Sequence, residues 1–180
     1  MTKPNKKAVL SILNIGARLL VICLAVAAIV SLVNELTKAR YAEILVEERK
    51  SAMTGIFGVS ELSYRELTDG IYEITAEDQL LGYCVQATTA GFGGDMSLMV
   101  GFSSDRSLRG VQILSHSETP GLGARVNDTN YLAQYNGKTG TLQLGSDIDA
   151  ISGATISSRA VLAGVSAAQT ALENALKEGY

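Results

Sequence analysis

The chain has 180 residues, of which 47% are hydrophobic and 18% are charged. This length corresponds to one domain, and a charged fraction below the roughly 25% of soluble domains argues against a disordered protein and against a nucleic-acid binder. Residues 1–34 contain four basic and no acidic residues, whereas residues 35–180 contain 11 basic and 18 acidic residues. A basic, apolar N-terminal part is therefore followed by an acidic body.

A transmembrane helix is predicted near the N-terminus. Fourteen of the fifteen residues in 19–33 are apolar, and the run extends back to Ala8 with few interruptions, which provides the roughly 20 residues that span a bilayer. We place the hydrocarbon section at Leu19–Leu36, with the Arg18 side chain reaching toward the N-terminal interface. The alternative is a cleaved signal peptide with a site at Ala25–Ala27, but the apolar run continues beyond that site.

The charges around this helix predict its orientation. By the positive-inside rule, the four cations of residues 1–34 hold the N-terminus in the cytoplasm. Lys38 and Arg40 on the far side give a weaker opposing bias. We therefore expect a single-pass protein of the cell membrane, with the body outside the cytoplasm.

A stalk and a set of strands are predicted after the membrane. Residues 34–53 have the apolar spacing of a helix, which would extend the membrane helix outward, and two glycines break it within 54–58. The expected divisions are 1–36 for the cytoplasmic N-terminus and anchor, 37–58 for the stalk helix, and 59–180 for the domain. Four segments have strand-like composition, and the last two form a hairpin: Gly70–Thr75, Leu80–Ala90, Met96–Phe102 and Arg109–Ser115.

The C-terminal part is predicted to end in a long helix. Pro120 and its glycines make Glu118–Gly123 a loop, which a short helix over Thr129–Tyr135 and a strand over Thr141–Leu144 follow. Ser157–Lys177 is a helix with one apolar stripe, made of Val161, Val165, Ala168, Leu172 and Leu176. Strands followed by a terminal helix predict an α+β domain.

A cluster of small and hydroxyl residues lies where this last helix begins. Asp149–Ser158 contains one glycine and four hydroxyl side chains. Small residues let backbone N–H groups approach a ligand, and a helix N-terminus carries partial positive charge, which together favour a phosphate. Serine and threonine are also ordinary helix caps. The local pattern leaves both interpretations open.

A family resemblance adds to this pattern. Asp149–Thr155 fits the flavinylation sequence D-x-x-[ST]-G-A-[ST], and Gly91–Gly94 and Ser115–Gly123 occur in the order that the same family shows. The chain thus resembles the FMN-binding domain shared by the G subunit of the Rnf complex and the C subunit of the sodium-translocating NADH:quinone reductase. Its short length is similar to the G subunit. It departs from relatives at Ser157–Ser158, where they often carry Thr and Ser.

The resemblance implies a covalently bound cofactor. FMN would be joined through its phosphate to Thr155 by a flavin transferase that consumes FAD with a divalent metal. That transferase would recognise Asp149, Ser152, Gly153, Ala154 and Thr155. In the bound state Leu122 would pack on the ring face, and Glu118 or Thr119 would reach a ring edge. The expected cofactor contacts are Glu118, Thr119, Gly121, Leu122, Ser152, Gly153, Ala154, Ile156 and Ser157.

The resemblance also implies a function and partners. The chain would be the electron-transfer subunit of the ion-translocating ferredoxin:NAD oxidoreductase (Rnf) complex, an electron carrier without catalytic residues of its own. Its partners would be other Rnf subunits, especially the membrane-embedded D-type flavin subunit and the iron–sulfur subunits. The alternatives are a C-type subunit of the sodium-translocating quinone reductase or a stand-alone extracytoplasmic flavoprotein. A non-enzymatic anchored scaffold or sensor, in which the hydroxyl-rich turn only caps the helix, is the least favoured alternative.

The remaining chemistry-bearing residues predict no further site. His116 is the single histidine, so we expect no metal site and a structural or rim position for it. Cys23 falls in the membrane segment and Cys84 in a strand, so no internal disulfide is available. No G-x-S-x-G elbow of a hydrolase occurs.

Overall fold

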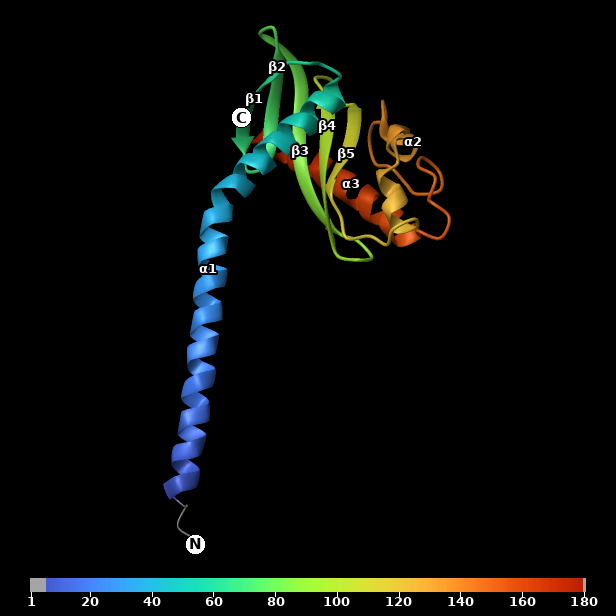
Figure 1. Cartoon of the computed structure of the whole chain (residues 1–180). Coiled ribbons are helices and arrows are strands. Elements are labelled where there is room, and N and C mark those ends of the chain that lie inside the picture. The colour runs from blue at the N-terminus through green and yellow to red at the C-terminus, as the bar shows by residue number, and fades with distance from the viewer. Residues whose placement is uncertain (1–5, 180) are drawn as a thin grey trace. The chain divides into compact units, whose positions relative to one another are not determined.

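The computed structural model describes residues 6–179, which form two compact units, one ending at Val46 and one beginning at Glu47. The described part of the first unit lies within helix α1 (Lys6–Phe57), and the second unit contains the end of α1 and every other element (Figure 1). These elements are β1 (Ser63–Thr68), β2 (Ile71–Ala76), β3 (Gln79–Ala90), β4 (Asp95–Ser103), β5 (Leu108–Ser115), η1 (Gly123–Asn127), α2 (Thr129–Leu132), η2 (Ala133–Tyr135) and α3 (Thr155–Lys177).

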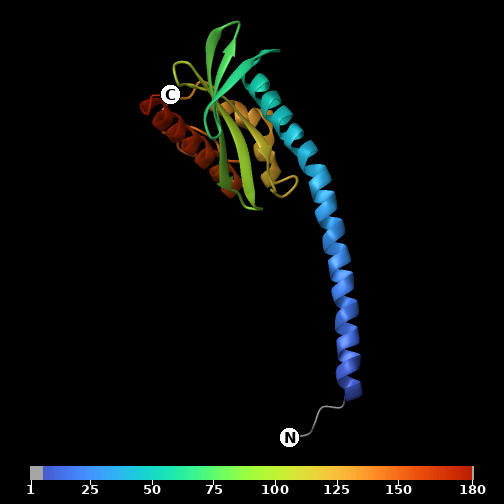
Figure 2. The same ribbon diagram turned by 90° about the vertical axis from the view of Figure 1, so that its left-hand side faces the viewer.

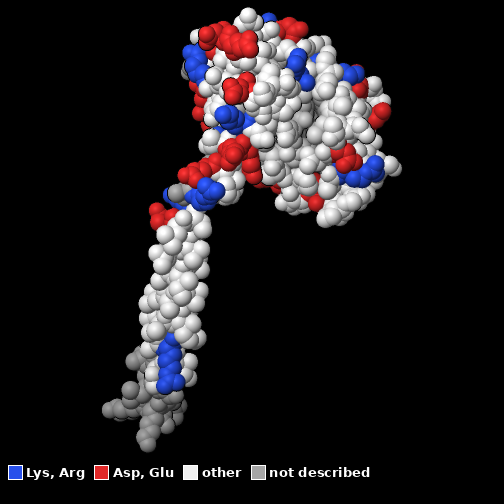
Figure 3. All heavy atoms as spheres, turned by 45° about the horizontal axis from the view of Figure 1, so that its top comes forward, with Lys and Arg blue, Asp and Glu red and all other residues white. Residues whose placement is uncertain are grey.

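Helix α1 contains one segment, Asn14–Lys38, that is long and apolar enough to cross a membrane. Within the described part of the chain, the side chains of this segment are all exposed. Figure 3 shows a length of this helix without charged side chains. The expected hydrocarbon section, Leu19–Leu36, lies inside the segment, so the predicted transmembrane candidate is confirmed. Lys3, part of the predicted cytoplasmic N-terminus, lies outside the described residues.

The end of α1 differs from the prediction. The helix does not break at Thr54 but continues through Gly55 to Phe57, and it stops where Gly58 adopts a φ of +68°. A glycine inside a helix costs about 1 kcal/mol relative to alanine. Burial of Ala52, Met53 and Phe57 in a core against the sheet offsets this cost. The sequence shows the glycines but not the tertiary packing that keeps the helix intact.

The sheet is an antiparallel meander with the strand order β1-β2-β3-β4-β5. All four predicted strands are present as β2 to β5, and β4 pairs with β5 as the predicted hairpin. β3 is the central strand, since Cys84 lies opposite Tyr72 of β2 on one side and opposite Gly101 of β4 on the other. Consecutive strands are neighbours throughout, so the sheet needs no crossover connection.

Strand β1 was not predicted. Five of its six residues are exposed, so it has no alternation of apolar and polar residues for a sequence pattern to detect. It forms by pairing with β2, with Ser63 opposite Thr75 and Arg65 opposite Glu73. An Arg65–Glu73 ion pair of 3.1 Å spans the two strands. Charged side chains of this kind are usual on an edge strand, where they disfavour pairing with another sheet.

The predicted strand at Thr141–Leu144 is wrong. The segment contributes only one isolated parallel bridge, between Leu144 and Ile148. Instead it forms a tight loop in which the Gln143 N–H donates to the Asp147 carboxylate at 2.8 Å. A chain that folds back on itself over so few residues satisfies its backbone locally and does not reach the sheet.

Two hydrophobic cores lie on opposite faces of the sheet. Helix α3 covers one face and the end of α1 the other (Figure 2). Strand β4 serves both, because Leu98 and Val100 join the α3 core whereas Met99 joins the α1 core. The predicted stripe of α3 is confirmed: four of its five residues are buried, and Leu176 packs on the same core half-buried. Sheet and terminal helix together confirm the α+β fold class.

Candidate functional site

Helix α3 begins at Thr155, two residues before its predicted start, and its first turn has no side-chain cap. The N-cap residue is Ala154, which has no polar group to offer. Within residues 6–179, no protein acceptor binds the N–H groups of Thr155, Ile156 or Ser157. The helix-cap interpretation of the hydroxyl-rich turn is therefore wrong. Free N–H groups at the start of a 23-residue helix form an anion-binding position.

The turn before α3 is fixed by hydrogen bonds at both ends. The Asp149 N–H donates to the Gln134 side chain at 2.8 Å, and the Ile151 N–H donates to Ser158 Oγ at 3.0 Å. Gly153 adopts a φ of +79°, and a Cβ placed on it would lie 3.0 Å from a methyl carbon of Leu122. A glycine is needed here because the backbone conformation is left-handed and the space beside it is already filled. Thr155, which follows directly, is exposed.

A cavity of about 260 Å³ opens beside this uncapped helix start. It brings together eight of the ten residues predicted to hold or contact the cofactor. Its lining is Phe92, Glu118, Thr119, Leu122, Gly123, Gly153, Ala154, Thr155, Ile156 and Ser157. Three segments that are distant in sequence thus meet at one site: the β3–β4 loop, the 118–123 loop and the start of α3.

Two predicted site residues lie elsewhere. Ser152 lines a separate cavity of about 740 Å³, together with Asp149, Arg125 and Gln134. Gly121 does not line the 260 Å³ cavity, and open space surrounds it. Ser152 and Asp149 were both predicted to contact the transferase. The turn therefore presents Thr155 to one cavity and Asp149 and Ser152 to another.

The rim of the 260 Å³ cavity is apolar. Phe92 is 67% exposed, Leu122 45% and Ile156 54%, and all three line the cavity. Large apolar side chains that gather at a cavity mouth mark a binding surface for an apolar partner or ring. Phe92 and Gly123 are the two lining residues that are not among the predicted contacts, and Phe92 is the one with a large side chain. Its signal in the sequence is an aromatic residue flanked by glycines in 91–94, where a buried core residue is not expected.

Glu118 lies inside the cavity wall and is only 5% exposed. Its Oε1 accepts a hydrogen bond from the Phe92 N–H at 2.7 Å, and its Oε2 accepts one from the Ser157 hydroxyl at 2.7 Å. Its own N–H donates to Nδ1 of His116 at 3.2 Å. His116 thus supports the loop that carries Glu118. Among residues 6–179, no group of three or more His, Cys, Asp or Glu side chains is placed to hold a metal ion.

A pair of buried tyrosines contacts the first turn of α3. The Tyr131 hydroxyl donates to the Ser158 carbonyl at 3.3 Å and lies 3.4 Å from the Tyr135 hydroxyl. Burial raises the pKa of both phenols above the ordinary value of 10.0. The two hydroxyls therefore stay neutral at physiological pH and act as hydrogen-bonding supports.

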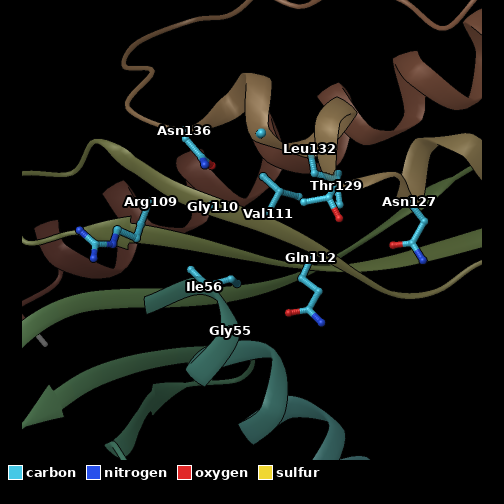
Figure 4. Close-up of a pocket in the computed structure, with 11 residues that line it drawn as sticks. Gly55, Ile56, Arg109, Gly110, Val111, Gln112, Asn127, Thr129, Leu132 and Asn136 are labelled. Atoms are coloured by element: carbon cyan, nitrogen blue, oxygen red, sulfur yellow. The ribbon is translucent and has the colours of Figure 1, made fainter. Parts of the chain in front are cut away.

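A further cavity, of about 320 Å³, lies between the end of α1, strand β5 and the α2–η2 segment (Figure 4). It contains none of the predicted site residues. Its one charged lining residue, Arg109, already donates to the Phe57 carbonyl at 3.3 Å and lies over the Phe57 ring. The 260 Å³ cavity, with its free N–H groups and apolar rim, is the candidate site.

The residues that line this site all lie within a region that matches a known family. Residues 91–170 match a family model described as FMN-binding domain. The fold is similar to the crystal structure of the C subunit of the Na(+)-translocating NADH-quinone reductase from Parabacteroides distasonis, with a TM-score of 0.52 and 21% identity, over 59% of this chain and 61% of that one. This second likeness concerns the fold alone. Fold and family match together define an FMN-binding domain, on a chain with one helix that is long and apolar enough to cross a membrane.

Two relatives identify the family. The G subunit of the ion-translocating oxidoreductase complex of Methanosarcina acetivorans is 32% identical over 160 residues, which cover 80% of this chain and 85% of that protein. The G subunit of the Na(+)-translocating ferredoxin:NAD(+) oxidoreductase complex of Acetobacterium woodii is 33% identical over 118 residues, 59% of this chain and 56% of the relative. The chain therefore belongs to the family of G subunits of ion-translocating oxidoreductase (Rnf) complexes. The resemblance identified from the sequence motifs is confirmed.

Proposed function

We propose that this chain carries FMN joined through its phosphate to Oγ1 of Thr155, and that it relays electrons within an ion-translocating oxidoreductase complex. The observation that carries the proposal is the uncapped start of α3 beside the apolar-rimmed cavity. The family supports FMN and electron transfer, and the covalent attachment to Thr155 is the finer step that we add.

The start of α3 suits a phosphodiester. Such a group keeps one negative charge after attachment, and the free N–H groups of Ile156 and Ser157 together with the helix dipole stabilise that charge. Gly153 and Ala154, which directly precede the helix, line the same cavity. Thr155 is exposed, so a transferase can reach its hydroxyl.

The apolar rim suits the flavin ring. Leu122 and Ile156 offer aliphatic contacts, and the Phe92 side chain offers an aromatic face or edge. Thr119 lines the same cavity and carries a hydroxyl that can hydrogen-bond a ring edge. When bound, FMN supplies the ability to accept and pass on electrons singly or in pairs, and this chain orients and shields it.

The attachment is a phosphoryl-group transfer. The Thr155 oxygen forms a bond to the FMN phosphorus of FAD, the pyrophosphate bond breaks, AMP leaves, and the hydroxyl proton is released to solvent. Asp149, Ser152, Gly153 and Ala154 are the other residues that we assign to the transferase. Asp149 and Ser152 line the 740 Å³ cavity, which is an opening separate from the one for the ring.

The membrane arrangement follows the charge pattern. We propose a single-pass protein whose domain, residues 59–180, lies outside the cytoplasm behind an anchor (1–36) and a stalk (37–58). Its partners are the other members of the complex, especially the membrane-embedded D-type flavin subunit and the iron–sulfur subunits. Ion transport belongs to the assembly, because the one candidate span among residues 6–179 has no charged residue between Arg18 and Glu35.

Intact-mass measurement of the full chain, co-expressed with a flavin transferase, tests the attachment. We expect one FMN adduct on the peptide that contains Thr155. Thr155→Val removes the hydroxyl and should abolish the adduct, whereas Thr155→Ser keeps a hydroxyl and should retain part of it. Thr170→Val is the matched control, since Thr170 is another exposed threonine of α3. A bare polypeptide mass for the wild type, or an undiminished adduct in Thr155→Val, contradicts the proposal.

A further inference from the structure

Glu118 joins three segments of the candidate site through one carboxylate. Oε1 accepts from the Phe92 N–H at 2.7 Å and from the Gly93 N–H at 3.5 Å, which ties down the β3–β4 loop. Oε2 accepts from the Ser157 hydroxyl at 2.7 Å, which ties down the first turn of α3. The carboxylate therefore connects the Phe92 side of the cavity to the helix turn that carries Thr155.

The surroundings of Glu118 leave room for this carboxylate and little else. A Cβ placed on Gly91 would overlap Oε1, and a Cβ placed on Gly123 would lie 2.5 Å from Oε2 and 2.8 Å from the Ser157 hydroxyl. Two glycines thus flank the carboxylate, one from each neighbouring loop. Both carboxylate oxygens accept hydrogen bonds, and only 5% of the residue is exposed. Glu118 therefore belongs to the wall of the cavity and not to its open surface.

The carboxylate of Glu118 has three donors and no ion-pair partner. The donors are the Phe92 and Gly93 N–H groups and the Ser157 hydroxyl. In the part of the chain that the structure describes, the ion pairs are Arg40–Glu43, Arg65–Glu73 and Arg125–Asp128. None of them involves Glu118, so no cation cancels its charge. The charge lies in a wall of the same cavity as Thr155.

We propose that Glu118 is the positioning residue of the flavin site: its carboxylate locks the first turn of α3 to the 91–94 loop and places an acidic side chain in the wall of the flavin cavity. The proposal rests on the proposed function for the identity of the ring. A fixed negative charge disfavours the addition of electrons to a neighbouring group, so it lowers the midpoint potential of a bound flavin. Glu118 thus acts on the flavin through geometry and charge.

Three variants of the full chain separate these effects. Glu118→Gln keeps the shape and removes the charge, and Ser157→Ala keeps the charge and removes the link to α3. Asp95→Asn is the matched control, because Asp95 is an exposed acid next to the 91–94 loop and makes no side-chain hydrogen bond among the described residues. The first measurement is amide hydrogen exchange in the flavin-free chain, and the second is the midpoint potential of the flavin in the loaded chain.

Glu118→Gln should make the Phe92 amide exchange about tenfold faster, the factor expected when one charge-assisted hydrogen bond weakens, and it should raise the midpoint potential. Ser157→Ala should speed exchange in the first turn of α3 and leave the potential closer to that of the wild type. Asp95→Asn should change neither. Unchanged exchange and unchanged potential in Glu118→Gln overturn the proposal. If Glu118→Gln does not fold, unchanged exchange in Ser157→Ala overturns it.

The two proposals fail in different ways. A wild-type chain without any flavin adduct contradicts the proposed function, yet the exchange measurement still tests the link between Glu118, the 91–94 loop and α3. If the wild type carries FMN but Glu118→Gln changes neither the amide exchange nor the midpoint potential, only the positioning role of Glu118 is contradicted.

Discussion

Ser158 accepts a hydrogen bond on its Oγ from the Ile151 N–H at 3.0 Å, and this bond closes the turn over the beginning of α3. Both residues are buried. The Ser158 carbonyl in turn accepts from the Tyr131 hydroxyl at 3.3 Å. A serine in the first turn of the helix, and not at its cap, therefore shapes the segment that presents Thr155.

Ser158→Ala should destabilise the fold. It leaves the buried Ile151 N–H without its partner, and such a loss costs about 1–3 kcal/mol. Urea unfolding of the full chain in mild detergent measures the change. Ser166→Ala is the control, since Ser166 is an exposed serine of α3 whose hydroxyl donates to the Leu162 carbonyl, and it should stay within about 0.5 kcal/mol of the wild type. Equal stabilities of the two variants would contradict the role of Ser158.

Two glycines that face each other across β4 and β5 should respond differently to alanine. A Cβ at Gly101 would overlap Cγ2 of Ile56, whereas a Cβ at Gly110 would meet the same atom at an ordinary 3.5 Å. We expect Gly101→Ala to cost about 1–3 kcal/mol through overpacking and Gly110→Ala to cost less. Thermal unfolding compares them. Adding Ile56→Ala to Gly101→Ala should recover part of the loss, and a double variant no more stable than the sum of the two single changes would oppose this explanation.

Leu122→Ala should expose the flavin without unfolding the domain. Leu122 is 45% exposed and lines the cavity, so its truncation removes a cover from the ring and little core. Quenching of flavin fluorescence by iodide in the loaded chain should become more efficient. Leu80→Ala is the control, because Leu80 is similarly exposed at 43% but lies in the β2–β3 hairpin. If iodide quenches the flavin fluorescence equally in both variants, Leu122 does not cover the ring.

The stability of the fold should fall at alkaline pH. Burial raises the pKa of the Cys84 thiol from 9.0 to about 12, so the folded chain holds this proton over a range in which the unfolded chain releases it. A raised folded-state pKa means that stability is full below pH 9 and declines between pH 9 and 12, by up to about 4 kcal/mol. The buried phenols of Tyr131 and Tyr135 act in the same direction above pH 10.

Urea unfolding at pH 7, 9 and 10 measures this decline. The free energy of unfolding should be nearly constant from pH 7 to 8.5 and should decrease above pH 9. Cys84→Ala lacks the thiol, so its free energy of unfolding should depend less on pH in this range, although it starts lower because of the cavity. A wild type and a Cys84→Ala variant with the same pH slope would show that the thiol does not contribute.

Local patterns in the sequence were sufficient for most elements. The apolar run of α1 is recognisable by its length alone. The four strands β2 to β5 and the stripe of α3 bury side chains at a regular period, and a period is visible within a few residues. Strand β1 has no such period because it is exposed and held by its neighbour. The expected strand at Thr141–Leu144 has strand-like composition but closes on Asp147 instead. Pairing partners, and not composition, decided both cases.

The sequence by itself determined that this protein has an apolar helix long enough to cross a membrane, an α+β body and a glycine–hydroxyl turn with a threonine at the start of its last helix. Only the tertiary structure decided that this helix start is uncapped, that Phe92 joins the rim of the cavity, and that Glu118 is enclosed between two loops and Ser157. The physical reason is the distance along the chain over which each effect acts, because periodicity and turn chemistry involve residues that are close in sequence. A cavity depends on segments tens of residues apart that the sheet and its cores bring together.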